Sequence, residues 1–154
     1  MDKHEGIKFK NTVTWEHRDK DGNLIEKETT ENLITNAGFD YLAALIGNAA
    51  GTPAKYIALT ADTGPASAAH TTLATEYTDS GLERVLGDYA HTGGTKIHTV
   101  SKTFTCSADN KVVAMAGLFN ASSSGSMLAE TVAAVAKTLY SAETLAVTWT
   151  LTLS

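Results

Sequence analysis

Cysteine, secretory signals and long apolar segments are scarce or missing in this chain of 154 residues. Cys106 is the single cysteine, which excludes an intramolecular disulfide and a cysteine-based zinc site. No apolar run approaches the roughly 20 residues of a membrane-spanning helix, so we expect no membrane partner. Residues 1–5 lack the apolar core of a secretory signal. We therefore expect the protein to be made and folded in a cytoplasm.

Positive charge is also scarce. The chain has 12 lysines and arginines against 17 aspartates and glutamates, which gives a formal net charge of −5. Binding to nucleic acid depends on the neutralisation of phosphates, so we expect no nucleic-acid partner. Hydrophobic residues nevertheless make up 43% of the chain, which is too many for a disordered protein. The composition and the length fit one globular domain.

The charges that are present concentrate near the N-terminus. Residues 1–31 hold eight of the 17 acids and six of the 12 lysines and arginines. Residues 32–154 form a body rich in Ala, Thr, Ser and Gly. Interface cores are depleted of charge, so one interpretation is a body whose surface is largely covered by partners. The alternative is a hydroxyl-rich surface that stays soluble without charge. We divide the chain into a charged arm, 1–31, and one domain, 32–154.

Alternating apolar and polar residues predict a fold built mainly of β-strands. The clearest case is the run 145–153, where apolar residues take every second position. Further strands are expected at 55–59, 81–86, 97–106, 111–119 and 127–139. Residues 87–95 read as a loop. This pattern predicts an antiparallel β-sandwich, or a jelly-roll-like fold.

One short helix is expected at about 36–47. Thr35 or Asn36 can cap its N-terminus by accepting hydrogen bonds from free backbone N–H groups. Gly47 is a suitable C-terminal stop. Apolar residues at helical spacing predict its buried face. These residues are Phe39, Leu42, Leu45 and Ile46.

The charged arm reads as a β-hairpin. A two-residue period runs through its first strand, and Asp21-Gly22 is a common hairpin turn. The return run is very polar, which favours an edge strand. The apolar stripe of the first strand either packs into the core or docks on another chain. For the second case, the partner-interface candidates are Ile7, Phe9, Val13, Trp15, Lys8, Lys10 and Arg18.

The remaining patterns predict no active site, no cofactor and no metal site. The five histidines (His4, His17, His70, His91 and His98) are scattered without the spacing of metal ligands, and surface positions are expected for them. The run 19–23 resembles the start of a calcium loop, but its glycine comes too early and a hairpin turn is favoured. Residues 122–126 read as a flexible loop without the frame of a nucleophile elbow. Glu83 and Arg84 are candidates for a structural ion pair.

Four segments, taken together, resemble small structural proteins of tailed bacteriophages and prophages. These segments are Asn32-Leu33-Ile34-Thr35-Asn36-Ala37-Gly38, the run 56–76 that begins Tyr56-Ile57-Ala58-Leu59, the run 116–129 that begins Ala116-Gly117-Leu118-Phe119-Asn120, and the terminal strand Leu145-Ala146-Val147-Thr148-Trp149-Thr150-Leu151. Many members of that group carry an acid just before the Ala-Gly-Leu-Phe segment, where this chain has Met115.

The resemblance implies a virion protein, and first of all a capsid decoration (cement) protein. Such a protein would bind the outer surface of the assembled major capsid protein lattice and stabilise it, as a homotrimer at three-fold sites. A tail, collar or fibre protein is the second reading. A carbohydrate-binding module for host-surface glycans is the third, with Tyr77, Tyr89 and Tyr140 as candidate aromatic contacts.

Overall fold

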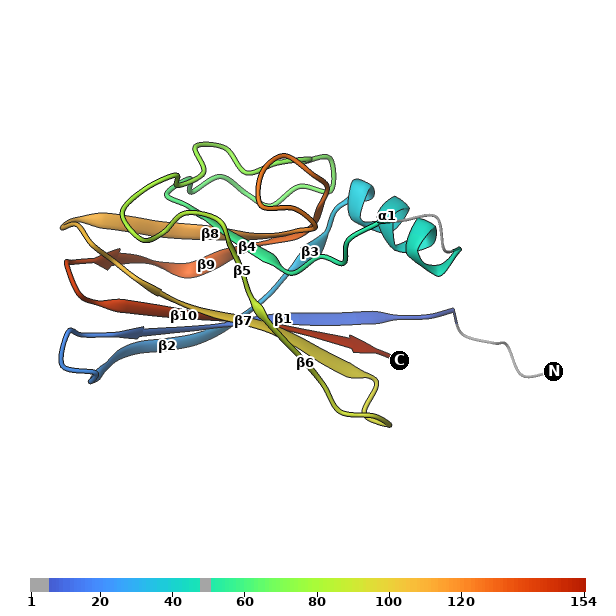
Figure 1. The fold of residues 1–154 in the computed structure, drawn as a ribbon, viewed down its shortest axis with the longest axis horizontal. Helices are drawn as coiled ribbons and strands as arrows, with labels where there is room; N and C mark the ends of the chain where they lie inside the picture. The colour runs from blue at the N-terminus through green and yellow to red at the C-terminus, as the bar shows by residue number, and fades with distance from the viewer. Residues whose placement is uncertain (1–5, 48–50) are drawn as a thin grey trace.

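The computed structural model describes residues 6–47 and 51–154, which form two five-stranded antiparallel sheets and one helix (Figure 1). Sheet A has the strand order β2-β1-β10-β7-β6. Its strands are β1 (Phe9–Arg18), β2 (Leu24–Glu31), β6 (Asp88–His91), β7 (Ile97–Thr105) and β10 (Thr144–Leu153). Sheet B has the order β3-β9-β8-β4-β5. Its strands are β3 (Leu33–Ile34), β4 (Tyr56–Thr60), β5 (Val85–Leu86), β8 (Lys111–Phe119) and β9 (Met127–Leu139). The expected β-sandwich is confirmed.

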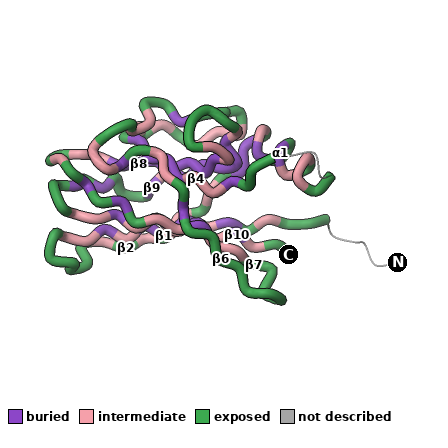
Figure 2. The backbone as a smooth tube through the Cα atoms, in the orientation of Figure 1, coloured by how far each residue is buried: buried purple, intermediate pink, exposed green. Residues whose placement is uncertain are grey.

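The main core lies between the two sheets (Figure 2). Strand β10 illustrates how each sheet contributes one face to this core. Its residues alternate between buried and half-buried positions, as expected for a strand with one covered face. Trp15 and Trp149 are fully buried at the centre of this core. Burial of such large side chains is the main stabilising contribution of the sandwich.

The N-terminal hairpin belongs to the sandwich and is not a separate arm. Strand β1 pairs with β10 along its whole length, from Phe9 opposite Leu153 to Arg18 opposite Thr144. It also pairs with β2, which is an edge strand as predicted. The prediction of a partner-binding stripe is wrong for Val13 and Trp15, because both side chains are completely buried in the core. The indole N–H of Trp15 donates to Thr30 Oγ1 at 2.9 Å.

A buried lysine connects the hairpin to the opposite sheet. Lys137 of β9 lies with its Nζ 2.9 Å from a carboxylate oxygen of Glu28 and 3.2 Å from one of Glu26, both on β2. The same Nζ donates to the carbonyl oxygen of Val135. The carboxylates of Glu26 and Glu28 in the hairpin therefore form ion pairs between the two sheets.

Helix α1 (Asn36–Ile46) closes one end of the sandwich. Thr35 caps it as predicted, since its Oγ1 accepts from the Gly38 N–H at 2.9 Å and donates to the Met127 carbonyl at 2.6 Å. Gly38 lies against the backbone of Leu128, where no side chain fits. The predicted buried face is only partly right. Leu42 and Leu45 are partly buried against the core, but Phe39 and Ile46 are 51% and 80% exposed. Tyr41, which is outside the predicted face, is buried.

A long connection, residues 61–84, covers the outer face of sheet B. Beneath it lies a second apolar cluster that includes Leu73, Met115 and Phe119. Arg84 holds this connection against the sheet. Its guanidinium lies 3.6 Å from the ring centroid of Phe119 and donates two hydrogen bonds to Glu76. The partner of Arg84 is thus Glu76, and Glu83 is exposed. Of the two ion-pair candidates, Arg84 therefore forms a structural ion pair, but its partner is Glu76 and not Glu83.

One stretch of the chain passes from the edge of sheet B to the edge of sheet A. The strand expected at 81–86 is only the two-residue β5, and the expected loop at 87–95 contains β6. Gly87 joins them at a point where a Cβ atom would collide with the Val100 side chain. Because β5 and β6 are short and lie at sheet edges, their alternation is too brief to be recognised in the sequence.

Candidate binding surface at the helix end

The end of the sandwich that carries α1 has an apolar groove. The start of β1 and the end of β10 reach this end beneath the helix (Figure 1). The groove has a volume of about 210 Å³. Leu42 and Leu45 of α1 form one wall, and Phe9, Leu151 and Leu153 form the other. Lys55, Tyr89 and His98 supply its polar groups. An apolar hollow with a few polar groups is the usual form of a binding site.

A second hollow, of about 260 Å³, lies on the other side of Phe9. Ile7, Leu33 and Phe39 contribute to its walls. Two buried amide side chains also line it: within the described part of the chain, Asn11 Oδ1 and both polar side-chain atoms of Asn32 have no hydrogen-bond partner. Buried polar groups are nearly always paired, so these amides are an exception within the interior beneath the hollow. Phe9 and Phe39 pack edge to face between the hollows, with ring centroids 6.1 Å apart.

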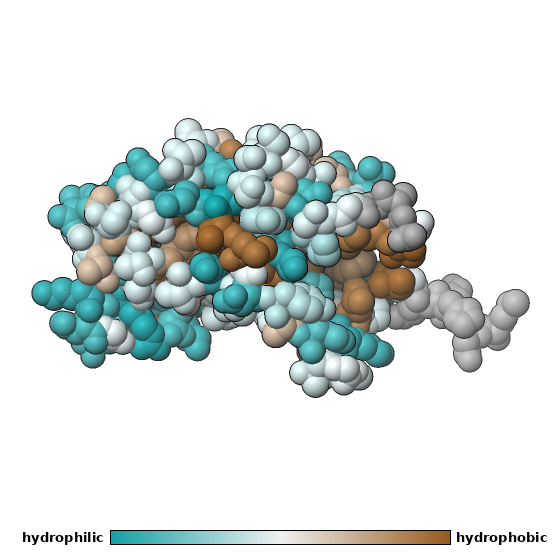
Figure 3. Space-filling view, viewed as in Figure 1, coloured by the Kyte–Doolittle hydropathy of each residue, from teal (hydrophilic) through white to brown (hydrophobic). Residues whose placement is uncertain are grey.

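Apolar side chains are exposed around both hollows. The most exposed are Ile46 and Ile7, at 80% and 70%, and Phe39 and Leu153 add to them. The space-filling view shows apolar surface gathered at this end, beside the helix (Figure 3). Contiguous apolar surface on a soluble domain is typical of an interaction site.

The two ends of the sandwich differ in charge. Four lysines lie at the helix end: Lys8 and Lys10 on the first part of the chain, Lys55 in the groove, and Lys96 in the β6–β7 turn. The opposite end carries the β1–β2 turn and the β9–β10 turn, where Asp19, Asp21 and Glu143 lie together with Arg18 and Lys20. A molecule with a net negative charge thus presents lysines beside its apolar end.

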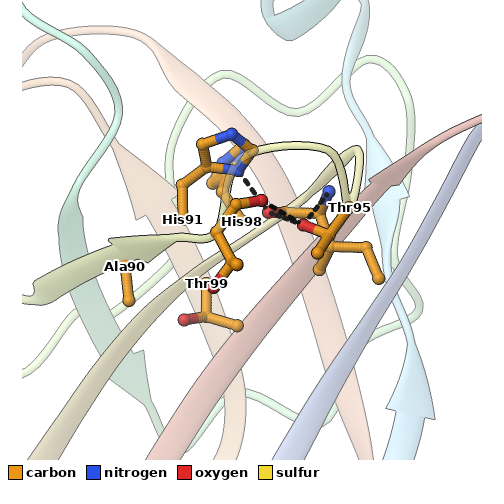
Figure 4. A pocket seen from close by; sticks show the side chains of 7 residues that line it. Ala90, His91, Thr95, His98 and Thr99 are labelled. Carbon is orange, nitrogen blue, oxygen red and sulfur yellow. Dashed lines mark hydrogen bonds between the residues drawn. The ribbon is translucent and has the colours of Figure 1, made fainter.

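The β6–β7 hairpin borders the groove and has a depression of its own, of about 230 Å³ (Figure 4). His91 and His98 are directly opposite each other in the strand pair. The Nδ1 of His91 lies 2.6 Å from the carbonyl oxygen of Ile97. The ring of His98 packs against Tyr89, with centroids 5.6 Å apart. Burial, and secondly the charge of His91, lower the pKa of His98 below its ordinary value of 6.5.

The sequence-predicted interface residues are divided between three places. Ile7, Phe9, Lys8 and Lys10 lie at the helix end, where Ile7 and Phe9 line the hollows. Val13 and Trp15 are in the core. Arg18 lies at the opposite end, where it pairs with Glu16 and donates to the Gly22 carbonyl. One coherent surface therefore contains four of the seven candidates.

Two histidines lie closer to carboxylates than the sequence suggests. His17, expected at the surface, is buried and lies 2.8 Å from Glu143, which is far from it in sequence. His70 contacts the buried Glu130 at 2.8 Å. His4 lies outside the described residues.

Residues 6–47 and 51–154 contain no group of three or more His, Cys, Asp or Glu side chains placed to hold a metal ion. No helix in the same ranges has the length and apolarity to cross a membrane.

The hairpin turn has the conformation that the sequence favoured over a calcium loop. Asp19 Oδ1 accepts hydrogen bonds from the backbone N–H groups of Asp21 and Asn23, at 2.9 Å each. Gly22 adopts a φ of 85°, which suits glycine. These contacts direct the carboxylate of Asp19 to its own backbone, as in an Asx turn.

Sequence reasoning missed the residues that make the helix end a surface. Phe39 and Ile46 were expected in the buried face, and His98, Leu151 and Leu153 were expected in ordinary strands. One signal was available: α1 has more apolar residues than one helix face can bury, so some must be exposed.

Comparison with known proteins found no matching family model, no matching curated protein and no matching solved structure.

Proposed function

We propose that this protein is a structural component of a bacteriophage virion, a capsid decoration protein that attaches to the major capsid protein lattice through its helix end. Its place would be the outer surface of the capsid. Support comes from the resemblance of four segments to phage structural proteins, and from the site described above. A protein that binds only the assembled shell stabilises that shell by mass action.

The observation that carries the proposal is the concentration of exposed apolar side chains at one end of the molecule. Exposed Ile7 and Phe39 line a hollow, and Ile46 is exposed further along the same helix. Apolar anchors around a few buried polar groups are the anatomy of a protein–protein interface.

The exposed lysines at this end favour a partner whose surface is acidic. Lys8 and Lys10 are exposed beside the apolar residues, and Lys96 is exposed in the neighbouring turn. A complementary capsid surface has acidic residues around an apolar centre, and the lysines speed its encounter with this end of the molecule. The homotrimer that the resemblance implies would then form through other faces of the sandwich.

A tail, collar or fibre position is the second candidate for the same surface, because its chemistry does not specify which virion protein it meets. Imaging purified virions with an antibody or tag on the protein distinguishes the two positions. Labelling over the head supports decoration. Labelling confined to the tail contradicts it, and labelling nowhere contradicts a virion role.

The carbohydrate-binding alternative finds less support in the arrangement of tyrosines. Tyr89 lies on β6, near the helix end, and is 56% exposed. Tyr140 follows β9 at the opposite end and is 47% exposed. Tyr77 is half-buried and donates to the Val112 carbonyl at 2.7 Å. Sugar sites stack a ring on neighbouring aromatics, and these three do not form such a platform.

A further inference from the structure

The β6–β7 hairpin brings together two imidazoles that are seven positions apart in sequence. His91 and His98 are directly opposite each other in an antiparallel pair, so their side chains emerge on the same face. Opposite residues in such a pair have Cβ atoms about 5 Å apart, which lets two imidazoles reach one ion. Both line the same depression at the base of the turn (Figure 4).

The hydrogen bond that Nδ1 of His91 makes leaves the other ring nitrogen, Nε2, free to bind a ligand. A carbonyl oxygen only accepts, so Nδ1 of His91 must carry the proton that is donated to Ile97 at 2.6 Å. In the neutral ring, Nε2 then has its lone pair available for a ligand. A backbone carbonyl on the other ring nitrogen is the usual support of a metal-binding histidine, because it fixes both the tautomer and the ring orientation.

His98 is held in place by its surroundings. Its ring is half-buried and packs against Tyr89 at a centroid distance of 5.6 Å. The ring lines the same depression as His91, directly across the strand pair. No carboxylate of the described residues forms an ion pair with either histidine, in contrast to His17 and His70.

We propose that His91 and His98 form a two-histidine site for a divalent transition-metal ion such as Ni²⁺, Cu²⁺ or Zn²⁺. Imidazole nitrogen suits these ions, and Cu²⁺ binds most tightly in the usual order. Two protein ligands leave the remaining coordination positions to water or to another molecule. The proposed metal site lies beside the proposed attachment surface and shares His98 with the groove, but both of its ligands come from the hairpin.

The test is isothermal titration of the full-length protein with Ni²⁺ at pH 7.5, with every variant made in an H4Q background to remove that imidazole. The parent protein is expected to bind one ion per chain. His91→Gln and His98→Gln are each expected to weaken binding at least tenfold, and His70→Gln, the matched control, to leave it unchanged. Circular dichroism checks that each variant is folded.

A second readout identifies the ligands without any substitution at the site. Copper EPR of the H4Q protein is expected to show two imidazole nitrogens on one Cu²⁺ ion. Absence of saturable Ni²⁺ binding up to 1 mM overturns the proposal, and so does binding that survives in the H91Q/H98Q double variant. A copper spectrum with no coordinated nitrogen also overturns it.

Discussion

Lys137 forms buried ion pairs that connect the two sheets. Its side chain is fully buried, and two carboxylates of β2 are its partners. Removal of one side of a buried ion pair leaves the other charge uncompensated, which costs about 3 to 5 kcal/mol. We therefore expect Lys137→Met to lower the free energy of unfolding by about 3 kcal/mol.

Urea denaturation measures this change, and a triple variant provides the control. Adding Glu26→Gln and Glu28→Gln to Lys137→Met removes the uncompensated carboxylates while keeping their hydrogen-bonding oxygens. Most of the lost stability should return in the triple variant. If the triple variant is no more stable than Lys137→Met, the loss comes from packing and not from charge.

His98 gives a second test at the residue scale, by NMR titration. Its imidazole is expected to titrate below 6.5, and His91→Gln should raise the pKa while leaving it below that value, because burial is the larger cause. The unfolded chain binds more protons than the folded one between the two pKa values. The contribution of His98 to stability is therefore present near neutral pH and decreases as the pH falls through 6.5. His98→Gln should remove that part of the acid dependence.

The buried charges are the part of the molecule that the sequence does not reveal. Alternation predicts β10 well, because one of its faces packs on the core. A continuous apolar run predicts β8, and β-branched residues favour a strand for β9, because both faces of these strands are largely covered. It assigns no partner to Lys137, His17 or Arg84, since each partner lies on a strand or loop that only the folded topology brings near. A charged residue in a sequence is read as exposed unless its partner is known.

At the scale of elements, the docking of α1 on β9 depends on one glycine. A Cβ atom at Gly38 would overlap the carbonyl oxygen of Leu128, which is backbone and cannot move aside alone. Gly38→Ala should therefore displace the helix and lower the free energy of unfolding by about 3 kcal/mol, at the upper end for an overpacked core.

Gly47→Ala is the matched control, because its Cβ would meet the Ala43 carbonyl at an ordinary 3.5 Å. Thermal unfolding of the two variants separates a close approach from a general effect of glycine. Equal melting temperatures for Gly38→Ala and the parent protein would show that the helix has room to move away from β9.

The hairpin of β1 and β2 is the element whose role changes most between sequence and structure. A polar return strand and a cluster of charges are typical of an arm, yet β1 lies between β2 and β10 and contributes Trp15 to the core. Deletion of residues 1–31 should leave a chain without cooperative thermal unfolding or near-UV circular dichroism, since it exposes Trp149 and the pairing edge of β10. A truncated chain that melts cooperatively would show that 32–154 is a domain by itself.

At the scale of the whole molecule, the sandwich has two dissimilar ends. One end has turns whose charged groups are satisfied internally, as at Asp19 and Glu143. The other has exposed apolar residues, unpaired amides and lysines. Under the proposed function, this asymmetry sets the orientation: we propose that the helix end faces the capsid and that the turns at the other end point outward.

The binding of two paired variants to capsids tests this account most directly. Phe39→Asp/Ile46→Asp places charge on the helix end, and Leu24→Asp/Ile25→Asp does so at residues of β2 that are 50% and 52% exposed. Each protein is mixed with capsids assembled from the major capsid protein of the same genome, and occupancy is measured by co-sedimentation. The account predicts that the helix-end variant loses at least tenfold in affinity while the β2 variant binds like the parent. Full occupancy by the helix-end variant, or no binding by the parent protein, would contradict it.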